Sequence, residues 1–293
     1  METRLRGTGS ELVIGPDQPF CIIGERINPT NKKRLTRAIR ESEWAYLQRM
    51  AKRQVDGGAH IVDINVGVPG VDEAAAMRSA VRAVQEAVDV PISIDSSTID
   101  VLLAGMEVAE GRPLVNSVPA EETYMKRLLP AIKDRDLPMV GMCMRGGANM
   151  PATVEERFEI AQTLLREAEK HGIEPHDVII DVLILPIGAD HTTGQTTLDT
   201  IRRVSSELGN NTSVGLSNLS FGMPDRNFMN AMMLGMSVRS GLTAAIMDPL
   251  QTQTRMAILA TDMIRGLDEF SMGWIAEFRK RQAKKAAKKK GAA

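Results

Sequence analysis

The chain has 293 residues, of which 43% are hydrophobic and 25% charged, and its formal net charge is −1. This length suits one large α/β barrel or two ordinary domains with a substantial core. The near-neutral charge gives no reason to expect nucleic acid or a membrane surface as a partner, and no run of about 18 apolar residues predicts a transmembrane helix.

The first eighteen residues carry positive charges but lack the apolar stretch of a signal peptide. We expect residues 1–18 to form an extended N-terminal arm of a cytoplasmic protein. The two cysteines, Cys21 and Cys143, form no CxxC pair, and no histidine is spaced with them as a metal ligand. We therefore expect a reducing compartment and no metal site. Cys143 is expected to be a buried small hydrophobe rather than a thiolate.

Eight short apolar runs rich in β-branched residues recur along the chain. They cover residues 20–25, 60–65, 91–95, 113–117, 138–143, 177–183, 213–218 and 242–248. Near-continuous apolar runs are typical of strands that are buried on both faces of a parallel sheet. The sequence therefore predicts eight buried strands.

Amphipathic segments separate these runs. Residues 35–58 and 153–172, for example, have apolar residues every three or four positions and end at glycine, which predicts helices. Eight strands alternating with helices predict a (β/α)8 barrel over residues 19–275. An open, doubly wound sheet is the alternative, but GERINP at 24–29 lacks the glycine pattern that such sheets use after an early strand.

Two further segments each allow two interpretations. Residues 276–293 include the basic stretch RKRQAKKAAKKK, which predicts a solvated tail, with docking of an acidic partner protein as the alternative. The methionine-rich stretch 223–236 predicts a helix that packs in the core. Its alternative role is an adaptable apolar rim for a partner protein or a seam between two subunits.

Polar side chains stand at or near the carboxyl ends of the predicted strands, which form the active-site face of such a barrel. They are Glu25, Asn28, Asp63, Asn65, Asp95, Asn116, Asp181, Ser217, Asn218 and Asp248. Helix capping is a competing explanation, but it fits poorly with Asp63, Asp95, Asp181 and Asn218, which lie within apolar runs. Because a buried charge without partners is costly, these residues predict a ligand rich in hydrogen-bond donors.

The residue types narrow the chemistry of this ligand. Lysine, arginine and a glycine-rich cradle are missing from the predicted strand ends, which argues against phosphate. Mg²⁺ would suit the oxygen ligands. Asparagine is as frequent as aspartate, however, and amides pair well with heterocycle edges that carry both donors and acceptors. The 2-amino-4-oxo edge of a pterin is such an edge.

Six motifs, in this order, carry a family resemblance: GERINP, VDINVG, ISIDSS, LVNS, IDVLILP and GLSNLS. Over residues 20–270 the chain resembles the pterin-binding methyltetrahydrofolate:corrinoid methyltransferases. It is also similar to the methyltetrahydrofolate-binding module of cobalamin-dependent methionine synthase and, more distantly, to dihydropteroate synthase. The resemblance implies a (β/α)8 barrel, a homodimer, and methyl exchange between N5 of tetrahydrofolate or 5-methyltetrahydrofolate and a corrinoid. Since no DxHxxG motif occurs, the corrinoid is expected on a partner protein.

The resemblance also implies roles for single residues. Asp95, Asn116 and Asp181 would hold the edge of the pterin ring. Asn218 would reach N5, the atom that carries the methyl group. An amide can stabilise N5 by hydrogen bonding but cannot supply a proton at neutral pH.

Two more residues complete the implied site. Asp63 would support the network, and a proton would reach N5 through water connected to this carboxyl group. Arg226 would face the folate side or the partner. Phe221 stands where some members of the family carry a polar residue, so no polar contact to the pterin is expected from it.

Three other functions are considered. A dihydropteroate synthase would need cationic groups for a departing pyrophosphate, whereas the seventh and eighth predicted strands end in Ser217-Asn218 and Met247-Asp248-Pro249. A non-catalytic folate-binding protein would not require Asn218. A metal-dependent barrel aldolase or hydrolase would show metal-dependent activity. The favoured function is that of a component in a multi-protein demethylase or acetyl-CoA pathway, with the direction of methyl transfer left open.

Overall fold

Eight parallel strands form the centre of the molecule in a computed structural model that describes residues 1–146 and 150–290. Along the sheet the order is β10-β3-β4-β5-β6-β7-β8-β9. The strands are β3 (Cys21–Ile27), β4 (Ile61–Ile64), β5 (Ile92–Asp95), β6 (Leu114–Pro119), β7 (Met139–Met142), β8 (Val178–Asp181), β9 (Thr212–Ser213) and β10 (Ala244–Met247). β4, β5, β7, β8 and β10 lie inside predicted apolar runs, and β3 and β6 overlap most of one. β9 shares only Ser213 with the predicted run 213–218, most of which forms the turn after this short strand.

The sheet closes on itself between its two ends. The backbone N–H of Ile246 donates to the carbonyl oxygen of Val214 at 2.9 Å, and Gly215 forms a parallel bridge with Ile246. Closure removes the two free edges that an open sheet would have. The predicted (β/α)8 barrel is therefore confirmed, and the open doubly wound sheet is excluded.

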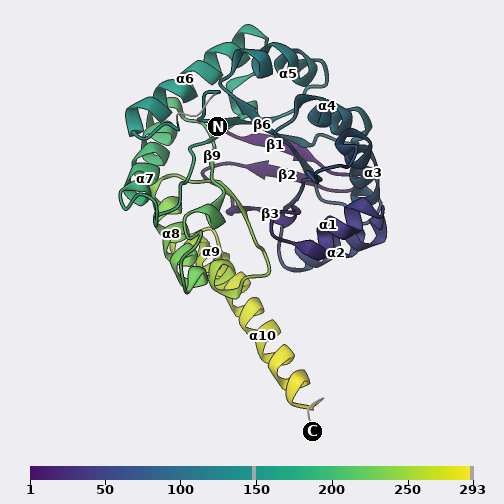
Figure 1. Ribbon diagram of the computed structural model, residues 1–293. Helices are drawn as coiled ribbons and strands as arrows, with labels where there is room; N and C mark the ends of the chain where they lie inside the picture. Colours follow the sequence, from purple (N-terminus) through teal and green to yellow (C-terminus); the bar gives the residue numbers. More distant parts are fainter. Residues whose placement is uncertain (147–149, 291–293) are drawn as a thin grey trace.

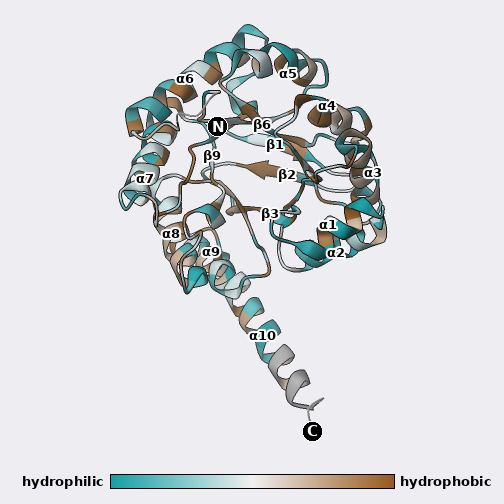
Figure 2. Ribbon diagram, in the orientation of Figure 1, coloured by the Kyte–Doolittle hydropathy of each residue, from teal (hydrophilic) through white to brown (hydrophobic). Residues whose placement is uncertain are grey.

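A ring of helices surrounds the strands (Figure 1). Apolar positions alternate with hydrophilic ones along these helices (Figure 2). The helices are α1 (Lys33–Arg40), α2 (Trp44–Asp56), α3 (Glu73–Gln85), α4 (Ile99–Val108), α5 (Glu122–Asp134), α6 (Val154–Lys170), α7 (Thr193–Arg203), α8 (Arg226–Ser240), α9 (Thr252–Ile264) and α10 (Met272–Lys290).

The two helical segments predicted in detail behave differently. Helix α6 begins with a capping box between Thr153 and Glu156, and the glycine after its end, Gly172, has a φ of 77°. The segment 35–58 is divided into α1 and α2, because Ser42 adopts a φ of 55°. Both halves bury apolar residues, such as Leu35 in α1 and Leu47 in α2. The break thus allows two short helices to pack where one long helix was predicted.

The first residues of the chain form a β-hairpin of β1 (Thr3–Arg6) and β2 (Glu11–Ile14). Leu5 and Ile14 are buried in one apolar cluster with residues from the amino-terminal halves of the barrel strands, among them Cys21, Ile61 and Ala244. The expected N-terminal arm therefore covers the amino-terminal end of the barrel, opposite the face where the polar residues gather.

The last described helix, α10, extends away from the barrel (Figure 1). It includes most of the expected basic tail, whose residues 291–293 lie outside the described residues. Across residues 1–146 and 150–290, no helix combines the length and apolar character that a membrane crossing requires.

Candidate functional site

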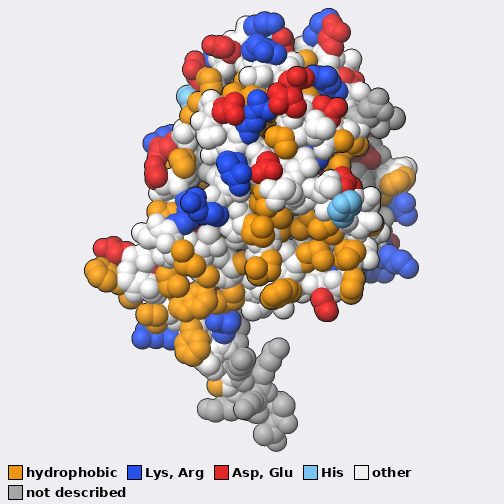
Figure 3. All heavy atoms as spheres, turned by 90° about the vertical axis from the view of Figure 1, so that its left-hand side faces the viewer, with side chains coloured by type: hydrophobic (Ala, Val, Ile, Leu, Met, Phe, Trp, Pro, Cys, Tyr) orange, Lys and Arg blue, Asp and Glu red, His pale blue; other side chains and the backbone are white. Residues whose placement is uncertain are grey.

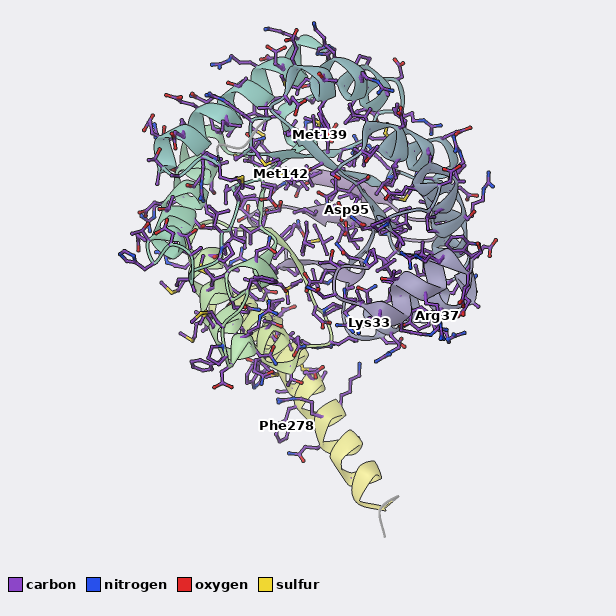
Figure 4. All side chains as sticks on the ribbon, in the orientation of Figure 1. Lys33, Arg37, Asp95, Met139, Met142 and Phe278 are labelled. Carbon is purple, nitrogen blue, oxygen red and sulfur yellow. The ribbon has the colours of Figure 1, made fainter. Side chains whose placement is uncertain are left out.

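A cavity of about 590 Å³ opens at the carboxyl ends of the strands. Figure 4 places Asp95 and Met142, two of the residues that line it, inside the ring of strands. All six residues to which the family resemblance assigns a role line this one cavity, and they are Asp63, Asp95, Asn116, Asp181, Asn218 and Arg226. They come from β4, β5, β6, β8, the turn after β9 and the start of α8.

Strand register sets the height of the side chains at the floor of the cavity. Asp95 is level with Asn116 on the neighbouring strand, and Asp181 is level with Met142 on one side and Ser213 on the other. Since alternate residues of a strand point to opposite faces, these pairs turn toward the barrel interior at the same level. Asp95 with Asn116, and Asp181 with Ser213, thus supply two polar parts of the cavity floor, and β7 between them contributes the apolar Met142.

Asp63 is buried beneath this floor, with 1% of its surface exposed. The amide of Asn116 donates to its Oδ1 at 3.1 Å. Burial and the negative charge of Asp95 raise the pKa of Asp63 well above the ordinary range. Burial also raises the pKa of Asp95, while hydrogen bonds from Asn65 and Asp63 oppose that shift. Asp63 is therefore the more basic carboxyl group of this pair, since its pKa is raised further than that of Asp95.

Asp181 is the third buried carboxyl group. Its Oδ1 accepts from the backbone N–H of Leu183 at 2.9 Å, and its Oδ2 accepts from the hydroxyl of Ser213 at 3.3 Å. Burial raises its pKa to about 6, against those two hydrogen bonds and the positive charge of Arg157. Asp181 can thus change its protonation state close to neutral pH.

Asn218 stands at the exposed side of the cavity, at the end of a 3-10 turn of residues 216–218. Its side chain lies over Gly215, where an added Cβ would stand 2.9 Å from Nδ2. Gly215 has a φ of −79°, so its backbone does not require glycine. Glycine is instead required at position 215 because any larger residue would occupy the space of the Asn218 amide.

Arg226 begins α8 and lies beside the same turn. Its guanidinium donates to the Ser220 hydroxyl at 3.0 Å and to the Ser217 carbonyl oxygen at 2.7 Å. These bonds tie the start of α8 to the turn that carries Asn218. In the described structure Arg226 thus braces the site as well as lining it.

Charged residues near β3 complete the cavity, and only some of them were recognised from the sequence. The Ser217 hydroxyl donates to Glu25 at 2.7 Å, and Lys32 donates to the Glu25 carbonyl oxygen at 3.0 Å. Arg26 pairs with Asp248 at 3.0 Å. The view that cations are missing here was therefore wrong. Arg26 within GERINP was visible as a signal, whereas Lys32 enters through a loop whose path cannot be read from periodicity.

Two further kinds of reactive site were considered, a reactive cysteine and a metal site. Cys143 is fully buried and burial raises the pKa of its thiol, which fits the expected inert side chain. Among the residues that the structure describes, no group of three or more histidine, cysteine, aspartate or glutamate side chains is arranged to hold a metal ion. What the cavity does offer is a floor of carboxyl and amide acceptors, suited to a heterocycle edge with N–H donors.

Comparison with known proteins also connects this chain with pterins. The family of pterin-binding enzymes matches residues 24–248. The methylcorrinoid:tetrahydrofolate methyltransferase of Eubacterium limosum is 32% identical over 267 residues, covering 89% of this chain and 96% of that protein. The methionine synthase of Mycobacterium leprae (strain TN) is 29% identical over 240 residues, and the match covers 77% of this chain but 20% of that protein.

Solved structures share the fold at lower identity. Dihydropteroate synthase of Xanthomonas albilineans with 4-aminobenzoic acid superposes with a TM-score of 0.69 at 20% identity, covering 90% of this chain and 98% of that one. The Yersinia pestis enzyme gives 0.66 at 16% identity, covering 91% and 100%. The family match spans nearly the whole barrel, and the E. limosum relative is matched over almost its full length. This chain therefore belongs to the family of pterin-binding enzymes.

Proposed function

We propose that this chain is a methyltransferase that moves a methyl group between N5 of tetrahydrofolate and the corrinoid of a separate protein. The observation that carries the proposal is the joint placement of Asn218 and the acceptors Asp95, Asn116 and Asp181 around one cavity. The name of the E. limosum relative supports the same reaction.

In this proposal the floor of the cavity binds the pterin ring edge. Asp95 and Asp181 accept from the amino group and ring N–H of the pterin. The side-chain N–H of Asn116 donates to Asp63. The side-chain carbonyl oxygen of Asn116 therefore remains able to accept a hydrogen bond from the ligand. Charge-assisted bonds of this kind contribute about 1.5–3 kcal/mol each, so losing one acceptor weakens binding by an order of magnitude or more.

Asn218 acts at N5. When N5 gains a methyl group it loses a proton, and in the reverse direction a proton must return as the methyl group leaves. The Asn218 N–H stabilises N5 as its charge changes. Asp63 is the buried group with the raised pKa, and it takes up or returns the proton through water. The corrinoid of the partner supplies or accepts the methyl group.

We propose that methyl transfer runs from the corrinoid to tetrahydrofolate, the direction named for the E. limosum relative. This direction suits a multi-protein system that demethylates methylated compounds. The reverse direction would suit acetyl-CoA synthesis. Rates measured in both directions with a methylated and an unmethylated corrinoid protein distinguish the two.

We also propose a homodimer, and the distribution of exposed apolar side chains supports it. Phe228, Met232 and Met236 are exposed along one side of α8, and Ile264 and Phe270 are exposed near the end of α9. Figure 3 shows hydrophobic side chains gathered on this side of the molecule. We call these five residues the α8/α9 apolar face. Each of the five side chains has more than half of its surface exposed, and exposed apolar side chains that gather on one face mark protein–protein contacts.

Calorimetric titration tests the binding half of the proposal. We expect the wild-type protein to bind tetrahydrofolate and 5-methyltetrahydrofolate saturably, and Asp181→Asn to lose most of this affinity because it loses a charged acceptor. A wild-type protein that binds neither folate would refute the proposed function.

Methyl transfer rates test the role of Asn218. We expect Asn218→Ala to lower the transfer rate at least about tenfold while the Kd for tetrahydrofolate changes by about twofold. Gly215→Ala should follow the same pattern, because its Cβ displaces the Asn218 amide. Gly194→Ala in α7 is the control, since a Cβ there meets nothing within 4 Å. Equal losses of rate and affinity in Asn218→Ala would contradict the assigned role.

A further inference from the structure

A second hollow adjoins the cavity along α1. Its volume is about 610 Å³, and it shares Asn31 and Lys32 with the cavity. We call it the α1 groove, and it is lined by Pro29, Asn31, Lys32, Lys33, Thr36, Arg37, Arg40 and Glu41. The cavity and the α1 groove are therefore neighbours, with Asn31 and Lys32 between them.

The α1 groove is strongly cationic. Its lining contains two lysines and two arginines against one carboxylate, Glu41. Arg37 faces Glu41 at 3.7 Å, a long ion pair between two exposed side chains, which contributes little. Lys33 and Arg37 are one helical turn apart on α1 (Figure 4). Such a groove favours an anionic ligand.

Lys32 marks the junction of the cavity and the α1 groove. It is half-buried and donates to the Glu25 carbonyl oxygen. Burial and the positive charge of Arg26 lower its pKa, although Glu25, Asp248 and Asp63 act in the opposite direction. An anionic group at this junction would offset the repulsion between Lys32 and Arg26.

The order of the strands gives the direction in which a bound folate leaves the cavity. The proposed ring-edge residues lie on β5, β6 and β8, and in the closed barrel the strands opposite these are β9, β10 and β4. C6 of a pterin, which carries the side chain of folates, lies on the opposite side of the ring from the 2-amino-4-oxo edge. The side chain is thus directed toward β10 and β3, and α1 follows β3 directly.

We propose that the α1 groove binds the glutamate tail of the folate substrate and gives this protein a preference for folates with several γ-linked glutamates. The inference rests on the proposed function. Each added glutamate contributes one more carboxylate, which the cations of α1 attract. The neighbouring hollow beside α8 is lined by Asp225 together with Arg226, so its charges balance and it lacks this attraction.

The test compares tetrahydrofolate with one glutamate and with five glutamates by calorimetric titration. We expect the wild-type protein to bind the pentaglutamate about tenfold more tightly at low ionic strength, and this preference to shrink as salt screens the charges. In the variant Lys33→Gln/Arg37→Gln the preference should be lost, while the Kd for the monoglutamate stays within about twofold of wild type.

The control is Lys126→Gln/Arg127→Gln, which removes the same two charges from exposed positions on α5 and should keep the preference. Equal affinity of the wild type for both folates would overturn the inference, as would a preference that persists in the α1 variant. Binding of neither folate would refute the proposed function itself. If the α1 variant instead raised KM for the corrinoid protein alone, the groove would be a contact for that partner and the inference would fail.

Discussion

At the scale of single residues, Asp181 links the cavity to pH. Burial raises its pKa to about 6, so the protonated form persists to higher pH than for an exposed aspartate. A carboxylate can accept hydrogen bonds from pterin N–H groups on both of its oxygens. In a carboxylic acid one oxygen carries a proton and is a donor, so it no longer suits a pterin N–H group. We therefore expect the affinity for tetrahydrofolate to fall as the pH is lowered through about 6, measured by titration across that range.

The matched variant for this experiment is Asp181→Asn, which has a similar shape and no ionisable group. Its affinity should be weak and should change much less with pH. A profile as steep as that of the wild type would assign the dependence to another group, with Asp95 the nearest candidate because burial also raises its pKa.

At the scale of elements, Arg157 of α6 holds the segment that follows β8. This guanidinium is 1% exposed and donates to the carbonyl oxygens of Pro151, Val182 and Leu183 at 3.0–3.2 Å and to Thr197 at 3.3 Å. The N–H of Leu183 in turn donates to Asp181. A helix on the outside of the barrel thus fixes a carboxylate in its interior.

We expect Arg157→Met to lower the free energy of unfolding by about 3 kcal/mol, because it leaves several buried carbonyl oxygens without donors. It should also weaken folate binding, since the Leu183 backbone would no longer be held. Thermal unfolding and titration measure the two effects. Arg166→Met, an exposed change on the same helix, should shift stability by less than about 0.5 kcal/mol. Unchanged folate affinity in Arg157→Met would show that Asp181 keeps its place without this support.

The same elements show what sequence can and cannot predict. The strands were predictable because burial on both faces imposes continuous apolar runs, and the position of Asp95 at the end of its run already places it at the barrel mouth. The break at Ser42 was not predictable, because residues 35–58 keep their helical spacing across it. Arg157 was missed for a related reason, since an arginine on an amphipathic helix is normally exposed.

At the scale of the whole molecule, the α8/α9 apolar face predicts association. We expect the wild-type protein to sediment as a dimer at micromolar concentration and Met232→Glu to sediment as a monomer, because a charge would be placed in an apolar contact. Met232 is 54% exposed, so the substitution should not disturb the barrel. Arg127→Glu on α5 is the control and should remain dimeric. A monomeric wild type would contradict the proposed homodimer.

The hairpin of β1 and β2 at the amino-terminal end of the barrel affects how the chain folds during its synthesis. β1 and β2 are synthesised before the barrel strands and can pair with each other at once, since only four residues separate them. Yet Leu5 and Ile14 share their cluster with Ala244, in the last strand to be made. Such contacts between distant parts of the chain slow folding. A nascent chain that stops short of β10 therefore has a hairpin but no closed barrel, and β10 must be synthesised before Leu5 and Ile14 reach their full set of neighbours.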